Sequence, residues 1–134
     1  MHESAAAYAR TAKTTLSGRD LEAQLLLRAA AKLTAVHDGW PTTSADLDPA
    51  LVFNRKLWTV FATSATRPDY PLPSTLKANI ANLAVFIFNR QFEIEKSPAP
   101  EKLRALISIN REVATGLRAR APAPGALAPM PASA

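Results

Sequence analysis

The stretch VFNRKLWTVF, residues 52–61, places an Asn-Arg-Lys triplet inside a run of large apolar side chains. If the stretch is a helix, each residue advances by about 100° around the helix axis. One wide face then carries Phe53, Leu57, Trp58, Val60 and Phe61, and the opposite face carries Arg55, Lys56, Thr59 and the following Thr63. Asn54 falls near the middle of the apolar face, where its carboxamide must bond inside the fold or to a partner chain.

Helical spacing recurs through most of the chain, because Gly and Pro are gathered in blocks between longer segments. After LEAQLLLRAAAKL, the sequence HDGWP is typical of a helix end, since Gly39 and Pro41 do not readily continue one. Asp48 followed by Pro49 is a favourable N-cap and first position for the next helix. We therefore expect long helices over residues 19–36, 49–65, 74–96 and 99–118.

The two ends of the chain differ from this pattern. Residues 3–13 are rich in Ala, with Tyr8 as the only sizeable apolar anchor, and predict a short helix that must dock or fray. The Pro/Ala-rich tail, residues 119–134, cannot bury a core and is expected to be disordered. The predicted fold is all-α: residues 1–118 form a single helical bundle of four major helices plus the short N-terminal helix.

Composition and charge narrow the classes of function. The chain has no cysteine, which excludes disulfides, a thiol nucleophile and a thiolate metal site. The net charge of +5 comes from basic residues spread along the chain, with no run longer than two, so a nucleic-acid partner is disfavoured without being excluded. No segment has the roughly 20 consecutive apolar residues of a membrane span. We expect a cytoplasmic protein with no membrane span.

Residues that could carry catalysis are sparse. His2 lies near the start of the chain and His37 near a helix end, and neither has a second ligand or an acid at useful helical spacing. The four glycines are scattered, so there is no phosphate-binding loop. We expect no enzyme activity, no cofactor and no bound metal.

Three polar side chains fall on predicted apolar faces. Asn54 and Asn110 are interpreted as core carboxamides that bond to backbone groups or to each other and fix the helix register. Glu22 has two open explanations. It either benefits from the helix dipole at its helix start or forms an ion pair with an arginine such as Arg55 or Arg111.

Large aromatic residues are in excess on the predicted helix 74–96. Phe86, Phe88 and Phe92 point in different directions, and one bundle face can bury only two such rings. Phe86 is either covered by another segment of the chain or part of an apolar strip that accepts an amphipathic helix from another protein.

Four segments together resemble the FlaF family of flagellar biosynthesis proteins. They are LEAQLLLRAAAKL, NRKLWTVF, LPSTLKANIANLAVFI and KLRALISINREVATGLR, and the resemblance covers roughly residues 5–118. It implies a cytoplasmic, non-enzymatic factor that binds flagellin as a secretion chaperone and supports flagellin production and export. It also raises FlbT, a regulator of flagellin synthesis, as a further partner.

The resemblance leaves the mechanism open. A chaperone would mask the amphipathic end segments of flagellin with apolar anchors, for which Trp58, Phe86 and Phe88 are the candidates, with Arg90 beside them. A post-transcriptional regulator would act on flagellin mRNA, directly or through FlbT, and direct contacts would weaken steeply with salt. The scattered charge favours the chaperone, while scaffolding with FlbT remains a third alternative.

Overall fold

The computed structural model describes residues 18–119. The helix expected over residues 3–13 and the Pro/Ala-rich tail lie outside the described residues, apart from Ala119. Within the described part, the helices are α2 (Gly18–Gly39), α3 (Leu47–Ala65), α4 (Ser74–Lys96) and α5 (Leu103–Ala119). Residues 18–119 contain no strand, so the predicted all-α bundle with four major helices is confirmed.

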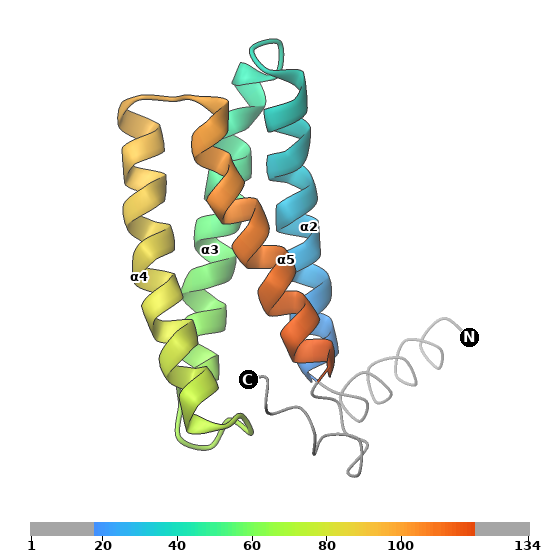
Figure 1. The fold of residues 1–134 in the computed structure, drawn as a ribbon, viewed down its shortest axis with the longest axis vertical. Helices are drawn as coiled ribbons and strands as arrows, with labels where there is room; N and C mark the ends of the chain where they lie inside the picture. Colours follow the sequence, from blue (N-terminus) through green and yellow to red (C-terminus); the bar gives the residue numbers. More distant parts are fainter. Residues whose placement is uncertain (1–17, 120–134) are drawn as a thin grey trace, which may run out of the picture.

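Consecutive helices run in opposite directions (Figure 1). α5 crosses the front of the bundle in this view and packs most extensively along α2, whereas α3 packs against both α2 and α4. α4 and α5 lie close only near the connection that joins them and then diverge. α4 is therefore the helix with the least coverage by its neighbours, and much of its surface faces outward.

Short 3-10 helices precede two of the long helices and shift their expected starts. The 3-10 helix Ser44–Asp46 leads directly into α3, whose N-cap is Asp46 without a side-chain capping bond. The prediction that Asp48 is the N-cap was therefore wrong. Pro49 is the third residue of α3, where a backbone N–H has no acceptor within the helix, so its missing donor costs nothing. Similarly, the 3-10 helix Pro100–Lys102 precedes α5.

The core is built from narrow apolar faces of all four helices. α2 contributes several small residues, with the buried set Ala23, Leu26, Ala29, Ala30, Leu33 and Val36. Trp58 and Phe61 of α3 meet edge to face, with ring centroids 5.3 Å apart. Val60 is 64% exposed, contrary to its predicted place on the apolar face. Only the part of that wide face centred on Trp58 packs into the core, and Val60 lies outside this part.

The turn after α2 depends on a close approach of backbone and side chain. Thr43 Oγ1 donates a 2.6 Å hydrogen bond to the carbonyl of Val36, which ties the turn to the last part of the helix. A Cβ at Gly39 would lie 2.5 Å from Thr43 Cγ2. Glycine at this position is what leaves room for the threonine methyl group.

Candidate partner-binding site

A chain of hydrogen bonds crosses the core between α3, α4 and α5. The Trp58 Nε1–H donates to Asn110 Oδ1 at 2.8 Å, and Asn110 Nδ2 donates to Asn54 Oδ1 at 2.7 Å. Asn54 Nδ2 then donates to Gln91 Oε1 at 2.8 Å, and Gln91 Nε2 donates to the Leu51 carbonyl at 3.0 Å. Among the described residues, no buried side-chain nitrogen or oxygen lacks a hydrogen-bond partner.

This chain of buried hydrogen bonds has a structural role. Asn54 and Asn110 are completely buried and bond to each other, as their positions on the apolar faces predict. A buried carboxamide without partners costs a few kcal/mol, so alignments of the three helices that separate the bonded groups are disfavoured. The two asparagines are therefore core residues that select helix register.

Trp58 does not fit its expected role as a partner anchor. Its side chain is 0% exposed, its ring packs on Phe61, and its indole N–H is bonded to Asn110. A side chain must be accessible in the free protein to contact a partner without unfolding. We therefore correct the expectation and remove Trp58 from the candidate binding surface.

Glu22 is bonded to a residue that the sequence interpretation did not consider. The Tyr70 hydroxyl, on the loop between α3 and α4, donates to Glu22 Oε1. Burial raises the pKa of the Glu22 carboxyl, while the Tyr70 hydrogen bond and the charge of Arg19 oppose that rise. Burial and the neighbouring carboxylate raise the pKa of Tyr70 as well. This contact fastens the loop to the start of α2.

The arginines suggested for Glu22 are engaged elsewhere. Arg55 pairs with Glu95 of α4 at 3.3 Å, and Arg111 donates to Thr34 Oγ1 at 3.3 Å. The alternative in which Glu22 forms an ion pair with Arg55 or Arg111 was therefore wrong. The carboxylate lies near the loop between α3 and α4, so its hydrogen bond comes from that loop.

The outward face of α4 carries three exposed large apolar side chains. We define the outer strip as Val85, Phe86 and Phe92, of which Phe86 is 39% exposed and Phe92 is 62% exposed. Val85 and Phe92 are seven residues apart and therefore share one line along the helix. The core-facing side of the same helix is buried, and within residues 18–119 the outer strip takes no part in the core.

Basic side chains lie over both phenyl rings of the outer strip. Arg90 is 5.1 Å from the ring centroid of Phe86, and Lys96 is 5.4 Å from that of Phe92. Each cation follows its ring by four residues, the spacing that brings side chains together on a helix. The aliphatic stems and charged ends partly shield the rings from water and give the outer strip a basic border.

Arg90 and Phe88 have structural contacts of their own. Arg90 pairs with Glu93 at 3.3 Å and donates to the Lys102 carbonyl at 3.3 Å, which links the end of α4 to the 3-10 helix before α5. Phe88 is half-buried and packs against the core. Of the candidate partner-binding residues, Phe86 has the most exposed aromatic ring, and the Arg90 guanidinium lies over that ring.

Sequence reasoning missed two residues on α4. Gln91 is buried and completes the carboxamide chain, and its signal was the alternating three- and four-residue spacing of Ile80, Ala84, Ile87, Gln91 and Ile94. Phe92 was noted among the aromatic residues in excess on this helix but was not named as a binding residue. The same spacing identifies it as outward-facing, because it lies directly after the buried Gln91.

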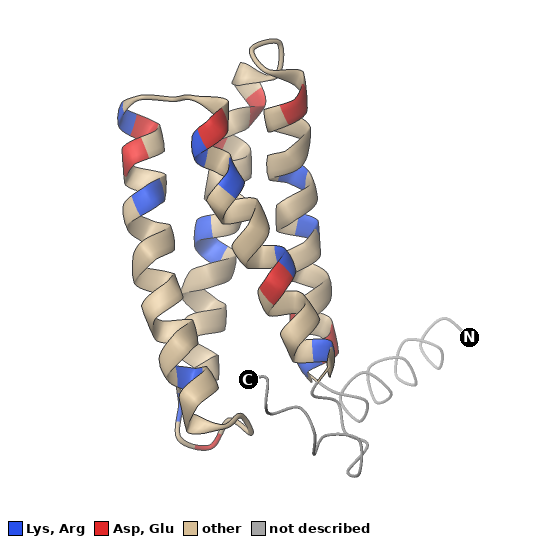
Figure 2. Cartoon of the chain, in the orientation of Figure 1, with Lys and Arg blue, Asp and Glu red and all other residues tan. Residues whose placement is uncertain are grey.

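In residues 18–119, no group of three or more His, Cys, Asp or Glu side chains is placed to hold a metal ion. None of the described helices is long and apolar enough to cross a membrane. Charged residues of both signs are distributed over all four helices (Figure 2).

Four antiparallel helices around a carboxamide chain, with an outer strip of apolar side chains on α4, define a small helical-bundle protein. The family model of flagellar protein FlaF matches residues 4–117. The chain therefore belongs to the FlaF family of flagellar proteins. Comparisons with curated proteins and with solved structures find no significant match.

Proposed function

We propose that this protein binds flagellin monomers in the cytoplasm as a non-enzymatic secretion chaperone and thereby supports flagellin production and export. Membership of a flagellar protein family supports a role in flagellum biogenesis. The observation that carries the proposal further is the outer strip, because apolar side chains exposed together on one helix are a common feature of partner-binding surfaces.

The outer strip suits an amphipathic helix. Val85 and Phe92 are separated by two helical turns on one line, and Phe86 lies about 100° further around the helix, at the other edge of the outward face. A partner helix laid along α4 would cover these side chains with apolar residues from successive turns of its own. Arg90 and Lys96 would then lie at the border, where acidic or carbonyl groups of the partner can meet them.

Binding of this kind would protect a secretion substrate before export. The resemblance to the family implies that the end segments of flagellin are amphipathic and unstructured in the monomer. Such segments expose apolar surface that promotes self-association. Covering one of them with the outer strip would keep the monomer soluble, and the modest size of the strip would allow release at the export machinery.

A binding titration tests the proposed role. We expect purified protein to bind flagellin monomer, measured by calorimetry, with an affinity that changes little between about 50 and 500 mM salt, because apolar burial survives moderate salt. RNA carrying the start of the flagellin message serves as the comparison. Tight RNA binding that falls steeply with salt, without binding to flagellin, would contradict the chaperone role and favour the regulator.

A further inference from the structure

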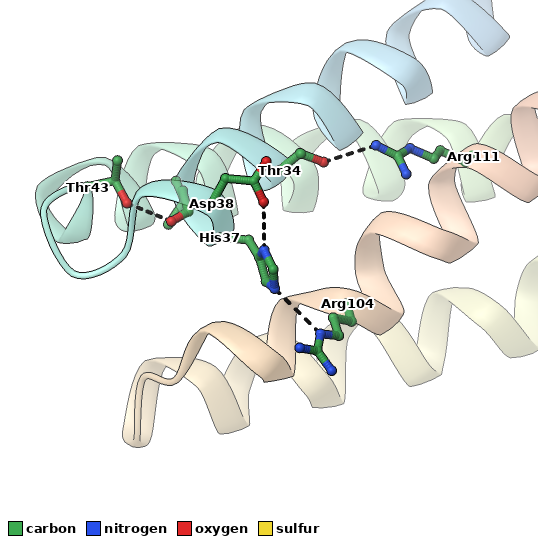
Figure 3. A network of polar contacts seen from close by, with 7 residues as sticks. Thr34, His37, Asp38, Thr43, Arg104 and Arg111 are labelled. Carbon is green, nitrogen blue, oxygen red and sulfur yellow. Dashed lines mark hydrogen bonds and ion pairs between the residues drawn. The ribbon is translucent and has the colours of Figure 1, made fainter.

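A second surface, the groove between α2 and α5, has a different chemical character. It has a volume of about 300 Å³ and is lined by Thr34, His37, Asp38, Arg104, Ile107, Ser108 and Arg111. Figure 3 shows Arg104 and Arg111 reaching from α5 toward polar side chains of α2. The groove thus combines two guanidinium groups and two hydroxyl groups with an apolar contribution from Ile107.

Within the described residues, the hydrogen bonds of the two groove arginines go to His37 and Thr34 and not to a carboxylate. Arg104 Nε is 3.4 Å from His37 Nε2, and Arg111 Nη2 is 3.3 Å from Thr34 Oγ1. Neither forms an ion pair within residues 18–119. Arg118, one heptad further along α5, is different because it pairs with Asp20 at 3.2 Å. Most donors of Arg104 and Arg111 therefore remain available to a ligand.

The acidic residue at the groove is oriented toward the histidine. His37 Nδ1 lies 2.9 Å from Asp38 Oδ1, and His37 Nε2 faces the donor Nε of Arg104. The imidazole ring therefore lies between the Asp38 carboxylate and the Arg104 guanidinium, with one ring nitrogen facing each. Asp38 is thus engaged by His37 and does not form an ion pair with either arginine.

We propose that the groove between α2 and α5 binds an acidic peptide segment of a partner protein, with one carboxylate on Arg104 and a second on Arg111. The arginines are seven residues apart on one helix, a rise of about 10 Å. Two glutamates at the same spacing on a partner helix would match them. A guanidinium binds a carboxylate through two parallel hydrogen bonds, so two such contacts fix position as well as charge.

The groove fits separate carboxylates better than a nucleic-acid backbone. Phosphates follow one another closely along a strand and favour a continuous track of cations. Here the two arginines are two helical turns apart, and the groove lining also includes the carboxylate of Asp38, which would repel a phosphate backbone. This surface does not involve the outer strip of α4, so the inference does not rest on the proposed chaperone function.

The test uses the full chain and a labelled helical peptide with two glutamates seven residues apart. The matched peptide has glutamines at both positions. We expect amide NMR shifts on peptide addition at Thr34, His37 and Ser108. Arg104→Gln and Arg111→Gln should each weaken binding about tenfold, because each removes one charged contact. Arg118→Gln is the matched control on the same helix and should change the affinity less than about twofold.

Several results would overturn the inference. Equal binding of the glutamine peptide would show that carboxylates are not recognised. Equal losses in all three arginine variants would indicate attraction by net charge alone. A single-stranded RNA oligonucleotide that binds more tightly than the glutamate peptide and shifts the same amide signals would show that the groove recognises phosphate groups instead. Circular dichroism of each exposed Arg→Gln variant confirms that the fold is retained.

Discussion

At the scale of single residues, the carboxamide chain decides how three helices fit together. The side chains of Trp58, Asn110, Asn54 and Gln91 each donate one hydrogen bond in this chain. Each carboxamide oxygen accepts one, and the Leu51 carbonyl is the final acceptor. A shift of α4 or α5 by one turn would leave buried amide groups unpaired. Because that penalty is paid in a medium of low polarity, the network favours one register over its neighbours.

Replacing the centre of this chain should be costly. Asn110→Leu leaves the Trp58 indole N–H and the Asn54 oxygen without their partner and adds an apolar side chain in a packed core. We expect the free energy of unfolding to fall by about 1–3 kcal/mol, measured by urea denaturation.

A double-mutant cycle assigns the loss to the network. Trp58→Phe removes the indole donor, so Trp58→Phe combined with Asn110→Leu should destabilise less than the sum of the two single changes. Additive losses would mean that Asn110 contributes through packing rather than through its bond to Trp58.

Glu22 gives the fold a pH dependence of known direction. Burial raises the pKa of Glu22 in the folded protein above its ordinary value of 4.5. The stability that the protonated carboxyl contributes is therefore fully present below that value and is lost as pH rises through the folded pKa. Glu22→Gln keeps an acceptor for Tyr70 and cannot ionise. Its free energy of unfolding should exceed that of the parent at neutral pH.

The comparison with the parent across pH is the measurement. Urea unfolding of both proteins between about pH 4 and pH 8 should show their difference growing as pH rises. Glu112→Gln, at an exposed position of α5, is the control and should follow the parent. A Glu22→Gln variant that is less stable than the parent at neutral pH would show that the ionised carboxylate stabilises the Tyr70 contact.

At the scale of elements, α4 has two faces with different roles. Ile87 is completely buried and Phe92 is largely exposed, although both are large apolar residues of the same helix. Ile87→Ala should lower the free energy of unfolding by about 2–5 kcal/mol through the cavity it leaves. Phe92→Ala should change it by less than about 0.5 kcal/mol. Equal losses in urea denaturation would place Phe92 in the core.

Sequence periodicity predicted the four long helices because their apolar spacing is regular and their ends are marked by Gly and Pro. The starts of α3 and α5 were less accurate, since a 3-10 turn before a helix has no distinct periodic signal. Asn54 and Asn110 were predicted as a core pair because each lies on an apolar face. Their connection through Gln91, like the bond from Tyr70 to Glu22, depends on tertiary packing.

The outer strip illustrates why a wide apolar face is ambiguous in sequence. Trp58 was expected as an anchor, yet the tertiary contacts of α3 turn it into the core. Phe86, Phe88 and Phe92 were all noted as aromatic residues in excess, but of the three only Phe88 packs against the core. Periodicity gives the angle between side chains, whereas the neighbouring helices decide which angle is covered.

At the scale of the whole molecule, two surfaces of different chemistry lie on different helices. The outer strip of α4 is apolar with basic residues over its rings, while the groove between α2 and α5 is polar and basic. α4 is the least covered helix in Figure 1, whereas α2 and α5 pack closely along their length. Variants on one surface should therefore leave the other unaffected, which makes the two proposals independently testable.

The affinity of outer-strip variants for flagellin monomer tests the central proposal most directly. Phe86→Ala should weaken binding by about 1–3 kcal/mol, and Phe86→Ala combined with Phe92→Ala should weaken it further, because both remove apolar contact area. Leu21, which is 41% exposed on α2, provides the matched control Leu21→Ala, with unchanged affinity expected. Urea denaturation should show all variants folded. If the folded double variant binds flagellin as tightly as the parent, the outer strip of α4 is not the binding site.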